Sequence, residues 1–297
     1  MDNELTLFDR LNIIRDVLRK YGEDQFYISF SGGKDSTVLH YLIDEALPEN
    51  RILRVYVDTG IEYNDVKAFV KELQAHDDRI EIIKPSVNIK QTLERDGYPF
   101  KSKEHSLVLS VYQNSGFTKT VNCYLDIDRQ KYNCPKILRY QFSEEFNLKV
   151  SNKGCHRMKK DPFKKWEKDN KKTVVMTGMM SNEGGLRESI QNCIITDKEG
   201  CLKKFHPLLK VSEAWEEWYI RERNIKLCKL YYPPYSFKRT GCKGCPYALG
   251  LQEQLEVMYT LMPDEYRQCE IIWKPVYDEY RRIGYRLKKI IEPVLPI

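Results

Sequence analysis

The stretch FSGGKDSTVLHYL (residues 30–42) decides how this sequence is interpreted. It joins an apolar segment, QFYISFS (25–31), to STVLHYLIDEAL (36–47), in which apolar residues recur at helical spacing. Two glycines, a lysine, an aspartate and two hydroxyl side chains stand between the predicted strand and the predicted helix. A polar turn between two elements is one explanation of this composition, and a phosphate-binding loop is the other.

This loop has the composition of an anion-binding site at the start of a helix. The first N–H groups of a helix have no partner within it, and the helix dipole places positive potential there. Gly32 and Gly33 let the backbone approach a ligand closely, because neither carries a Cβ atom. The other side chains suited to an anion are those of Ser31, Lys34, Ser36 and Thr37. The loop therefore predicts a pyrophosphate or sulfate site, with Asp35 as a cap of the helix.

The segments around the loop alternate between strand and helix patterns. Short apolar and β-branched segments predict strands at 25–31, 51–60, 79–86, 171–180 and 201–209. Apolar residues at helical spacing predict helices at 4–20, 36–47, 63–76 and 212–225. Ser212 is the predicted N-cap of the last of these helices. The alternation favours an α/β fold with a parallel sheet flanked by helices.

The remainder of the chain has weaker patterns. Residues 88–150 contain helical pieces, residues 231–250 are broken by prolines and glycines into a loop, and residues 251–287 form a final helical stretch. We expect residues 1–230 to form a nucleotide-binding α/β domain. Residues 231–297 are expected to form a cysteine-containing helical region that packs on it.

Several motifs resemble those of a known group of enzymes. The loop differs from the Walker pattern, which has four residues between its first glycine and its Gly-Lys pair. SGGKDST (31–37) instead resembles the PP-loop of the ATP pyrophosphatase superfamily, whose fold is of the adenine nucleotide α-hydrolase type. Resemblance to the phosphoadenylyl-sulfate (PAPS) reductase-like branch spans roughly residues 25–270. It includes the motifs VDTGIEYND (57–65), DGYPFKSKEHS (96–106), TGMMSNEGGLRES (177–189) and KKFHPLLKVSEAWEEWYIRERNI (203–225).

The resemblance implies a site for ATP or a related adenine nucleotide, with Mg²⁺ on its phosphates. The implied nucleotide-binding residues are Ser31, Gly32, Gly33, Lys34, Asp35, Ser36, Thr37, Asp58, Thr59, Gly60, Lys101, Lys103, Gly178, Glu183 and Arg187. The expected catalytic residues are Lys34, Asp58 and Arg187. Asp58 is suited to ribose, adenine or Mg²⁺, and also to capping a turn. Arg187 is suited to bidentate anion binding, whereas Lys101 and Lys103 either neutralise phosphate or sulfate charge or are solvated.

Nine cysteines in a chain without a secretory signal favour metal binding or catalysis over a disulfide framework. GCKGCP (241–246) contains a CxxC turn, which can aim two thiolates at one metal centre or act as a redox pair. Cys155, in NKGCHRMKKDPF (152–163), resembles one position of a Cys-Cys pair in adenylyl-sulfate reductases, where the pair joins a CxxC around a [4Fe–4S] cluster. Gly154 replaces the first cysteine of that pair.

The predicted metal ligands are Cys155, Cys242, Cys245 and Cys269. Cys269 supplies the fourth ligand if the last helical stretch folds back over the CxxC loop. All-thiolate ligation does not by itself distinguish a [4Fe–4S] cluster from zinc, and the resemblance favours the cluster. Cys123 and Cys134 are weaker candidates for ligands.

The charge balance is mildly basic, with 49 basic and 43 acidic residues among 297 and a formal net charge of +6, which suits a polyanionic ligand. The basic stretch RMKKDPFKKWEKDNKK (157–172) predicts a solvated helix face, or contact with a nucleic acid or a bulky nucleotide. No segment approaches the roughly 20 apolar residues of a membrane span, and the acidic, amphipathic N-terminus is not a signal peptide. We expect a cytoplasmic protein that does not contact membranes.

Three functions remain open from the sequence. The first, which we favour, is adenylylation of a nucleic-acid or protein acceptor with release of pyrophosphate, followed by attack of sulfur. This is the chemistry of tRNA-thiolating enzymes and of the PP-loop component of DNA phosphorothioation, to which the chain is similar. The second is reduction of adenylyl sulfate or its 3′-phosphorylated form to sulfite. That reaction uses a cysteine in a mobile C-terminal tail, and no cysteine follows Cys269. The third is a nucleotide-sensing or nucleic-acid-binding module without turnover.

Overall fold

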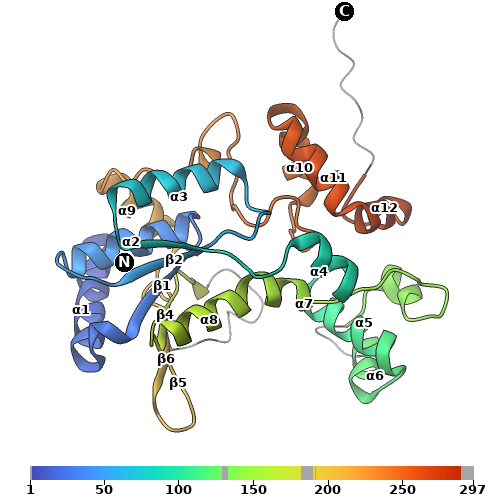
Figure 1. Ribbon diagram of the computed structural model, residues 1–297, viewed down its shortest axis with the longest axis horizontal. Helices are drawn as coiled ribbons and strands as arrows, with labels where there is room; N and C mark the ends of the chain where they lie inside the picture. Colours follow the sequence, from blue (N-terminus) through green and yellow to red (C-terminus); the bar gives the residue numbers. More distant parts are fainter. Residues whose placement is uncertain (1, 129–132, 182–189, 191, 289–297) are drawn as a thin grey trace, which may run out of the picture. The chain divides into compact units, whose positions relative to one another are not determined.

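The computed structural model describes residues 2–128, 133–181, 190 and 192–288 (Figure 1). The chain forms two compact units that interleave along the sequence. The described residues of unit 1 fall within Met1–Asp58, Glu62–Lys84 and Pro162–Gly241. Those of unit 2 fall within Thr59–Ile61, Pro85–Asp161 and Cys242–Ile297. The single domain boundary expected between residues 230 and 231 stays a prediction.

Unit 1 contains a sheet whose described strands lie in the order β3-β2-β1-β4-β6-β5. Their bounds are β1 (Phe26–Phe30), β2 (Leu53–Val57), β3 (Ile80–Ile83), β4 (Val174–Met176), β5 (Ile194–Thr196) and β6 (Leu202–Phe205). Neighbouring strands are parallel, except that β5 and β6 are antiparallel. The α/β fold with a mainly parallel sheet, predicted from the sequence, is confirmed. Only β5 was not predicted, because a run of three residues, two of them half-buried and one exposed, is too short to show a strand pattern.

The order of the strands determines where a ligand can bind. β1 lies between β2 and β4, so the chain leaves β1 toward one side of the sheet and later returns to its other side. In open α/β sheets, ligands bind beyond the carboxyl ends of the strands at such a switch point. The segments that follow β1 and β4 are the glycine loop and the segment containing Gly178.

Five helices described in unit 1 correspond to predicted helices or to the basic stretch. Their bounds are α1 (Asn3–Tyr21), α2 (Lys34–Ala46), α3 (Asn64–His76), α8 (Asp161–Asp169, whose first residue belongs to unit 2) and α9 (Glu213–Glu222). Short 3₁₀ helices lie at Glu23–Gln25 and Lys229–Tyr231. The predicted N-cap is confirmed, since Ser212 Oγ accepts a hydrogen bond from the amide of Trp215 at 3.1 Å.

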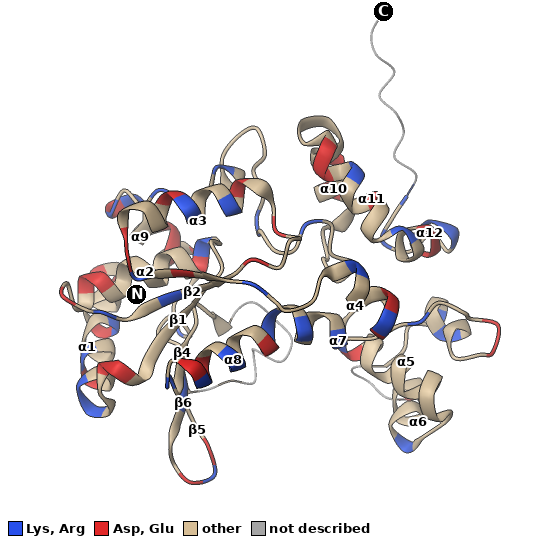
Figure 2. Ribbon diagram, in the orientation of Figure 1, with Lys and Arg blue, Asp and Glu red and all other residues tan. Residues whose placement is uncertain are grey.

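The basic stretch lies largely on α8 and has the form of a solvated helix face. Trp166 is buried, stacks obliquely on Tyr27 with ring centroids 5.0 Å apart, and donates from Nε1 to Glu81 at 2.6 Å. Basic and acidic residues alternate along the rest of α8 (Figure 2), and Lys164 and Lys165 are exposed. Burial of one aromatic side chain therefore fixes α8 against the sheet and leaves its lysines in water.

Unit 2 is helical in its described part. Its helices are α4 (Ile89–Asp96), α5 (Lys103–Ser115), α6 (Lys119–Leu125), α7 (Lys153–Cys155), α10 (Leu251–Leu261), α11 (Pro263–Ile272) and α12 (Lys274–Arg282). A 3₁₀ helix at Lys136–Gln141 and a π-helical segment at His156–Lys160 complete it. The final helical stretch expected at 251–287 is divided into three helices. Pro263 and Pro275 explain the divisions, because proline fits the first turn of a helix and interrupts its interior.

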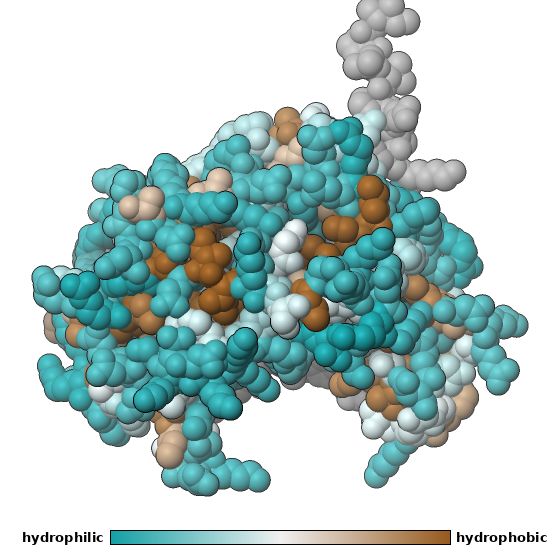
Figure 3. All heavy atoms as spheres, viewed as in Figure 1, coloured by the Kyte–Doolittle hydropathy of each residue, from teal (hydrophilic) through white to brown (hydrophobic). Residues whose placement is uncertain are grey.

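None of the described helices combines the length and the apolar character that a bilayer crossing requires. On the face of the molecule shown in Figure 3, apolar residues form patches that hydrophilic residues interrupt. Among the large apolar residues that the structure describes, the most exposed are Leu249, at 89%, and Ile271, at 76%. Scattered exposed apolar residues of this kind are common on folded proteins.

Candidate nucleotide site and cysteine pocket

The glycine loop follows β1 and leads into α2. Gly32 has a φ of 69°, in the left-handed region that favours glycine. A Cβ atom at this position would lie 2.7 Å from Cγ2 of Val70 on α3. Gly33 is the N-cap residue and no side chain caps the helix, so the prediction that Asp35 caps it is wrong. Asp35 already lies within the first helical turn, and its carboxyl group interacts with Glu216 instead.

Two backbone amides at the start of α2 are bonded to hydroxyl groups. The amide of Gly33 donates to Ser31 Oγ at 3.3 Å, and the amide of Lys34 donates to the hydroxyl of Tyr231 at 2.8 Å. The hydroxyls of Ser36 and Thr37 point back to the loop and donate to the Gly33 carbonyl at 3.0 and 2.9 Å. Hydroxyl oxygens thus occupy places that phosphate oxygens take at helix N-termini.

Tyr231 and Thr240 are site residues that the sequence did not indicate. Their hydroxyl groups lie 2.9 Å apart, and both would be 3.3 Å from a Cβ atom placed on Gly33. Both residues come from the proline- and glycine-rich segment that was predicted only as a loop. No spacing rule relates that segment to residues about 200 positions earlier, so only the folded chain could identify them.

Gly178 follows β4 and contacts the first turn of α2 directly. A Cβ atom on Gly178 would lie 2.4 Å from the Asp35 carbonyl oxygen and 3.1 Å from the Ser36 amide nitrogen. Because these are backbone atoms, no side-chain rotation could relieve the overlap. The absence of a side chain at position 178 therefore allows the segment after β4 to approach the glycine loop. A direct contact of Gly178 with a nucleotide stays a prediction.

Lys34 is held at both its backbone and its side chain. Besides the bond from its amide to Tyr231, its Nζ lies 3.0 Å from Oε2 of Glu216 on α9. The Glu216 side chain is completely buried, whereas 20% of the Lys34 side chain is exposed. Burial, reinforced by the Asp35 charge, raises the pKa of Glu216 to about 7. Glu216 was also missed from the sequence, although a glutamate next to the buried Trp215 of an amphipathic helix was a usable signal.

The other predicted nucleotide residues are placed as follows. Asp58 follows β2, and its Oδ1 lies 3.0 Å from Nζ of Lys67 on α3. Thr59 is buried and Gly60 has a φ of 85°, and both belong to unit 2. Glu183 and Arg187 lie outside the described residues. The nucleotide-binding and catalytic roles of all these residues stay predictions.

Lys101 and Lys103 belong to unit 2. The Lys101 ammonium donates to the hydroxyl of Tyr124 at 3.1 Å, its amide donates to Tyr280 at 2.7 Å, and burial lowers its pKa. Lys103 is exposed at the start of α5, and its charge acts on the thiol of Cys155. These contacts are made within unit 2, and binding of phosphate or sulfate by either lysine stays a prediction.

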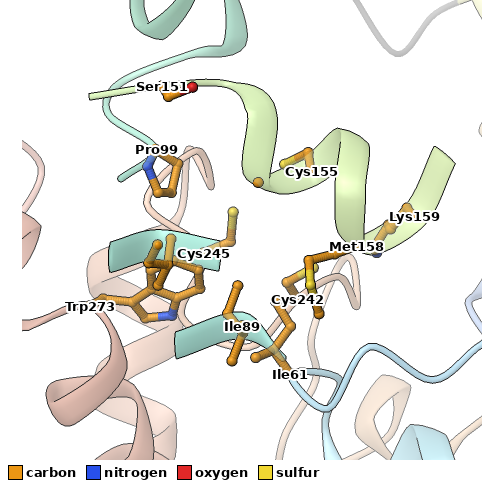
Figure 4. A pocket seen from close by; sticks show the side chains of 12 residues that line it. Ile61, Ile89, Pro99, Ser151, Cys155, Met158, Lys159, Cys242, Cys245 and Trp273 are labelled. Atoms are coloured by element: carbon orange, nitrogen blue, oxygen red, sulfur yellow. The ribbon is translucent and has the colours of Figure 1, made fainter. Parts of the chain in front are cut away.

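Three of the four predicted metal ligands line one small cavity in unit 2. Cys155 approaches it from the end of α7, and Cys242 and Cys245 approach it from the CxxC loop (Figure 4). The cavity measures about 30 Å³ and is otherwise lined mainly by apolar side chains, among them Met158 and Trp273. Gly154, the residue before Cys155, also lines it. Burial raises the pKa of both Cys155 and Cys245.

The CxxC loop is fixed by hydrogen bonds from the C-terminal helices of unit 2. Trp273 Nε1 donates to the Lys243 carbonyl at 3.2 Å, and the Tyr277 hydroxyl donates to the Gly244 carbonyl. Gly244 has a φ of 58°, and a Cβ atom there would lie 2.4 Å from the Tyr277 hydroxyl oxygen. Lys243, within the motif, is buried and donates to Gln268 at 2.7 Å. These hydrogen bonds hold the loop against the C-terminal part of unit 2.

Cys269 does not line this cavity. It is completely buried in α11, near the backbone of Gly244, and burial raises its pKa to about 12. The charges that act on its thiol are those of Lys243, Glu265 and Glu270, not those of the other cysteines. Cys123 is exposed and Cys134 is buried, and neither lines the cavity.

The donor set fits a metal centre with three cysteine ligands. A single zinc ion with Zn–S bonds of about 2.3 Å brings its sulfur ligands to about 3.8 Å from one another. Among the described residues, the sulfur atoms of Cys155, Cys242 and Cys245 do not all lie within 4.8 Å of one another. The structure thus brings the three thiols to one cavity but does not place them at the spacing of three ligands on one zinc ion. Cys269 would need to move to supply a fourth ligand.

A glycine loop with hydroxyl side chains at the switch point of a parallel sheet defines a PP-loop protein. The sequence identifies the family within this class, because residues 25–131 and 103–248 match the phosphoadenosine phosphosulfate reductase domain family. The chain belongs to this family, which is the PAPS reductase-like branch of the PP-loop ATP pyrophosphatase superfamily.

Similar proteins include one curated sequence and several solved structures. A stretch of 73 residues is 34% identical to an uncharacterized protein of Methanocaldococcus jannaschii, and it covers 25% of this chain but only 17% of that protein. The PAPS reductase of Candida auris, solved as a phosphate complex, is 14% identical over 78% of this chain and 93% of that chain, with a TM-score of 0.43. The FMN adenylyltransferase of Candida glabrata in complex with ATP is 14% identical over 81% and 63%, with a TM-score of 0.47.

Proposed function

We propose that this enzyme uses ATP to adenylylate an acceptor and so prepares it for sulfur transfer. The observation that carries the proposal is the bonding of the Gly33 and Lys34 amides to hydroxyl oxygens at the start of α2. These amides already hold oxygen atoms at the carboxyl end of β1, at the switch point of the sheet. A phosphate oxygen of ATP that displaces the hydroxyl of Tyr231 would accept the hydrogen bond of the Lys34 amide in its place.

The proposed reaction begins with attack of an acceptor oxygen on the α-phosphorus of ATP. The bond to the β-phosphate breaks, AMP is joined to the acceptor, and pyrophosphate leaves. Loop amides and the Lys34 ammonium stabilise the negative charge of the leaving pyrophosphate. Asp58 would hold Mg²⁺ or the ribose, and Arg187 would bind a phosphate oxygen. Sulfur then attacks the activated centre and AMP leaves. We expect the acceptor to be a nucleic acid or a protein, in the cytoplasm.

The cysteine pocket would hold an iron–sulfur cluster, with Cys155, Cys242 and Cys245 as ligands. A bound cluster would supply electron transfer or a place to bind sulfur. A cavity of about 30 Å³ has room for roughly one water molecule, so its apolar walls must separate to admit a cluster. Zinc is the alternative occupant.

Reduction of adenylyl sulfate or its 3′-phosphorylated form is the second candidate function. The family membership favours it. The position of Cys269 speaks against this cysteine as the nucleophile, because a completely buried thiol with a pKa of about 12 is mostly protonated and inaccessible. A nucleotide-sensing or nucleic-acid-binding module without turnover is a third candidate.

Product analysis separates these functions. The wild-type protein is incubated with Mg-ATP and candidate acceptors, and separately with adenylyl sulfate and a thiol reductant. The proposal predicts pyrophosphate and an adenylylated acceptor in the first reaction, and no sulfite in the second. Sulfite in the second reaction would support the reductase, and nucleotide binding without any product would support the binding module.

Anaerobic purification with metal analysis and an absorption spectrum tests the cluster. We expect iron and sulfide with broad visible absorption, and we expect Cys242→Ser to lose them. Cys123→Ser is the matched control, because Cys123 is exposed and does not line the cavity. A wild-type protein that contains zinc, or no metal, would refute the cluster.

A further inference from the structure

Glu216 is a carboxylate buried beneath the start of the glycine-loop helix. It lies on α9 between two buried aromatic residues, Trp215 and Tyr219, and its side chain has no exposed surface. A buried carboxylate is costly unless a cation or a proton neutralises it. Its presence next to a site for negatively charged phosphates therefore requires a physical explanation.

The cation that neutralises Glu216 is Lys34, with Nζ 3.0 Å from Oε2. In the part of the chain that the structure describes, the ion pairs give Glu216 no second basic partner. Among the described residues, the other charges that act most on the pair are those of two carboxylates, Asp35 on α2 and Glu217 on α9. Asp35 acts on both members of the pair, and Glu217 acts on Lys34.

A phosphate bound at the loop competes with Glu216 for the same ammonium group. When Lys34 turns toward a phosphate oxygen, Glu216 is left buried beside Asp35 without its cation. An uncompensated carboxylate in such surroundings takes up a proton rather than remain charged. Even with Lys34 in place, burial raises the pKa of Glu216 to about 7. Loss of the Lys34 charge would raise this pKa further, so the proton would be taken from neutral or mildly basic solution.

We propose that Glu216 is a positioning residue that holds Lys34 in the free enzyme and releases it to the nucleotide by taking up one proton from solvent. The inference rests on the proposed use of Lys34 as a phosphate ligand. It assigns to the site a regulatory property, since nucleotide affinity becomes coupled to pH through a residue that does not touch the nucleotide.

Calorimetric titration with Mg-ATP in buffers of different ionisation enthalpy measures the number of protons taken up on binding. At about pH 8, where Glu216 is ionised in the free enzyme, the wild type should take up nearly one proton more than Glu216→Gln. At about pH 6 the two proteins should differ little. As the pH rises from about 6 to about 8, the affinity of the wild type for Mg-ATP should fall relative to that of Glu216→Gln, by up to about tenfold per pH unit. Protons that ATP itself exchanges cancel in the comparison.

Glu217→Gln is the matched control. It removes the same charge from the neighbouring, exposed position of α9 and should leave the proton uptake at the wild-type value. Adenylyl sulfate gives a second measurement that needs no variant, because its charge does not change near neutral pH. Binding of adenylyl sulfate to the wild type should also take up a proton at about pH 8.

Failure of the inference about Glu216 can be distinguished from failure of the proposed function. Binding of Mg-ATP with equal proton uptake in the wild type and Glu216→Gln would overturn the inference and leave the proposed function intact. If the wild type binds neither nucleotide, the proposed function fails and the inference fails with it. If Glu216→Gln does not fold, the absence of proton uptake by the wild type with adenylyl sulfate would still overturn the inference.

Discussion

Lys34 connects the two parts of the candidate site, because its amide faces Tyr231 and its ammonium faces Glu216. Neither partner could be predicted from the motif, which specifies residue types in the loop and not the residues that pack against it. The glycines were predictable to a greater degree. A Cβ atom at Gly32 or Gly178 would lie 2.7 Å or 2.4 Å from a neighbouring atom, and such close approaches are a common reason for glycine in a motif.

Replacement of Lys34 tests its proposed role in phosphate binding. Lys34→Ala should weaken Mg-ATP binding by on the order of 1–3 kcal/mol, because it removes a charged hydrogen-bond donor. Isothermal titration near neutral pH measures this change. Lys71→Ala, on the exposed face of α3, is the control and should bind as the wild type does. Equal affinities of Lys34→Ala and the control would refute the role of Lys34.

Replacement of Gly178 tests the close approach of the segment after β4 to α2. Gly178→Ala should lower the free energy of unfolding by about 1–3 kcal/mol, because its Cβ atom overlaps backbone that cannot rotate away. It should also weaken Mg-ATP binding, since the overlap displaces the first turn of α2. Gly241→Ala is the control, with open space at its Cβ position. Denaturant unfolding measures the stability of both variants. Equal unfolding free energies of Gly178→Ala and Gly241→Ala would contradict this contact.

At the scale of elements, hydrophobic pattern predicted the strands of the sheet better than it predicted the C-terminal helices. Strands such as β1 and β2 are nearly fully buried, so their sequences are short continuous apolar runs. The division of residues 251–287 into α10, α11 and α12 depends on prolines that were not weighed in the prediction. Cys269 is buried in α11 beside Gly244, and it is not among the residues that line the cavity of the other three cysteines.

Gly244 should be essential to the fixed CxxC loop. Gly244→Ala combines a left-handed backbone with a Cβ atom 2.4 Å from the Tyr277 hydroxyl oxygen, and we expect a loss of about 2–4 kcal/mol in unfolding free energy. Gly284→Ala is the control, because its φ of 65° is also in the left-handed region but its Cβ position is open. Thermal unfolding should separate the two variants. Similar stability of the two variants would show that the CxxC loop accommodates the added Cβ atom, and it would contradict this prediction.

At the scale of the whole molecule, buried neutral histidines should make stability depend on pH. Burial lowers the pKa of His40, His105 and His206 to about 4, from an ordinary value near 6.5. Between these values the unfolded chain binds protons that the folded chain does not bind. Stability is therefore present above about pH 6.5 and falls as the pH decreases toward 4.

His105 is suited to a test of this dependence, since it is completely buried and its ring bonds Tyr124 at 3.0 Å and Gln141 at 2.7 Å. Urea unfolding at about pH 7 and pH 5 should show a smaller loss of stability on acidification for His105→Gln than for the wild type, by on the order of 1–3 kcal/mol. His76→Gln, at an exposed position, is the control. If His105→Gln loses as much stability as the wild type between about pH 7 and pH 5, the account is contradicted.

The most direct test of the central claim is a crystal structure of the protein with Mg-ATP. The account predicts a phosphate oxygen within hydrogen-bonding distance of the Lys34 amide, in the place now taken by the Tyr231 hydroxyl, with the Lys34 ammonium turned from Glu216 to the phosphates. A nucleotide bound elsewhere, with Tyr231 still on that amide, would contradict it.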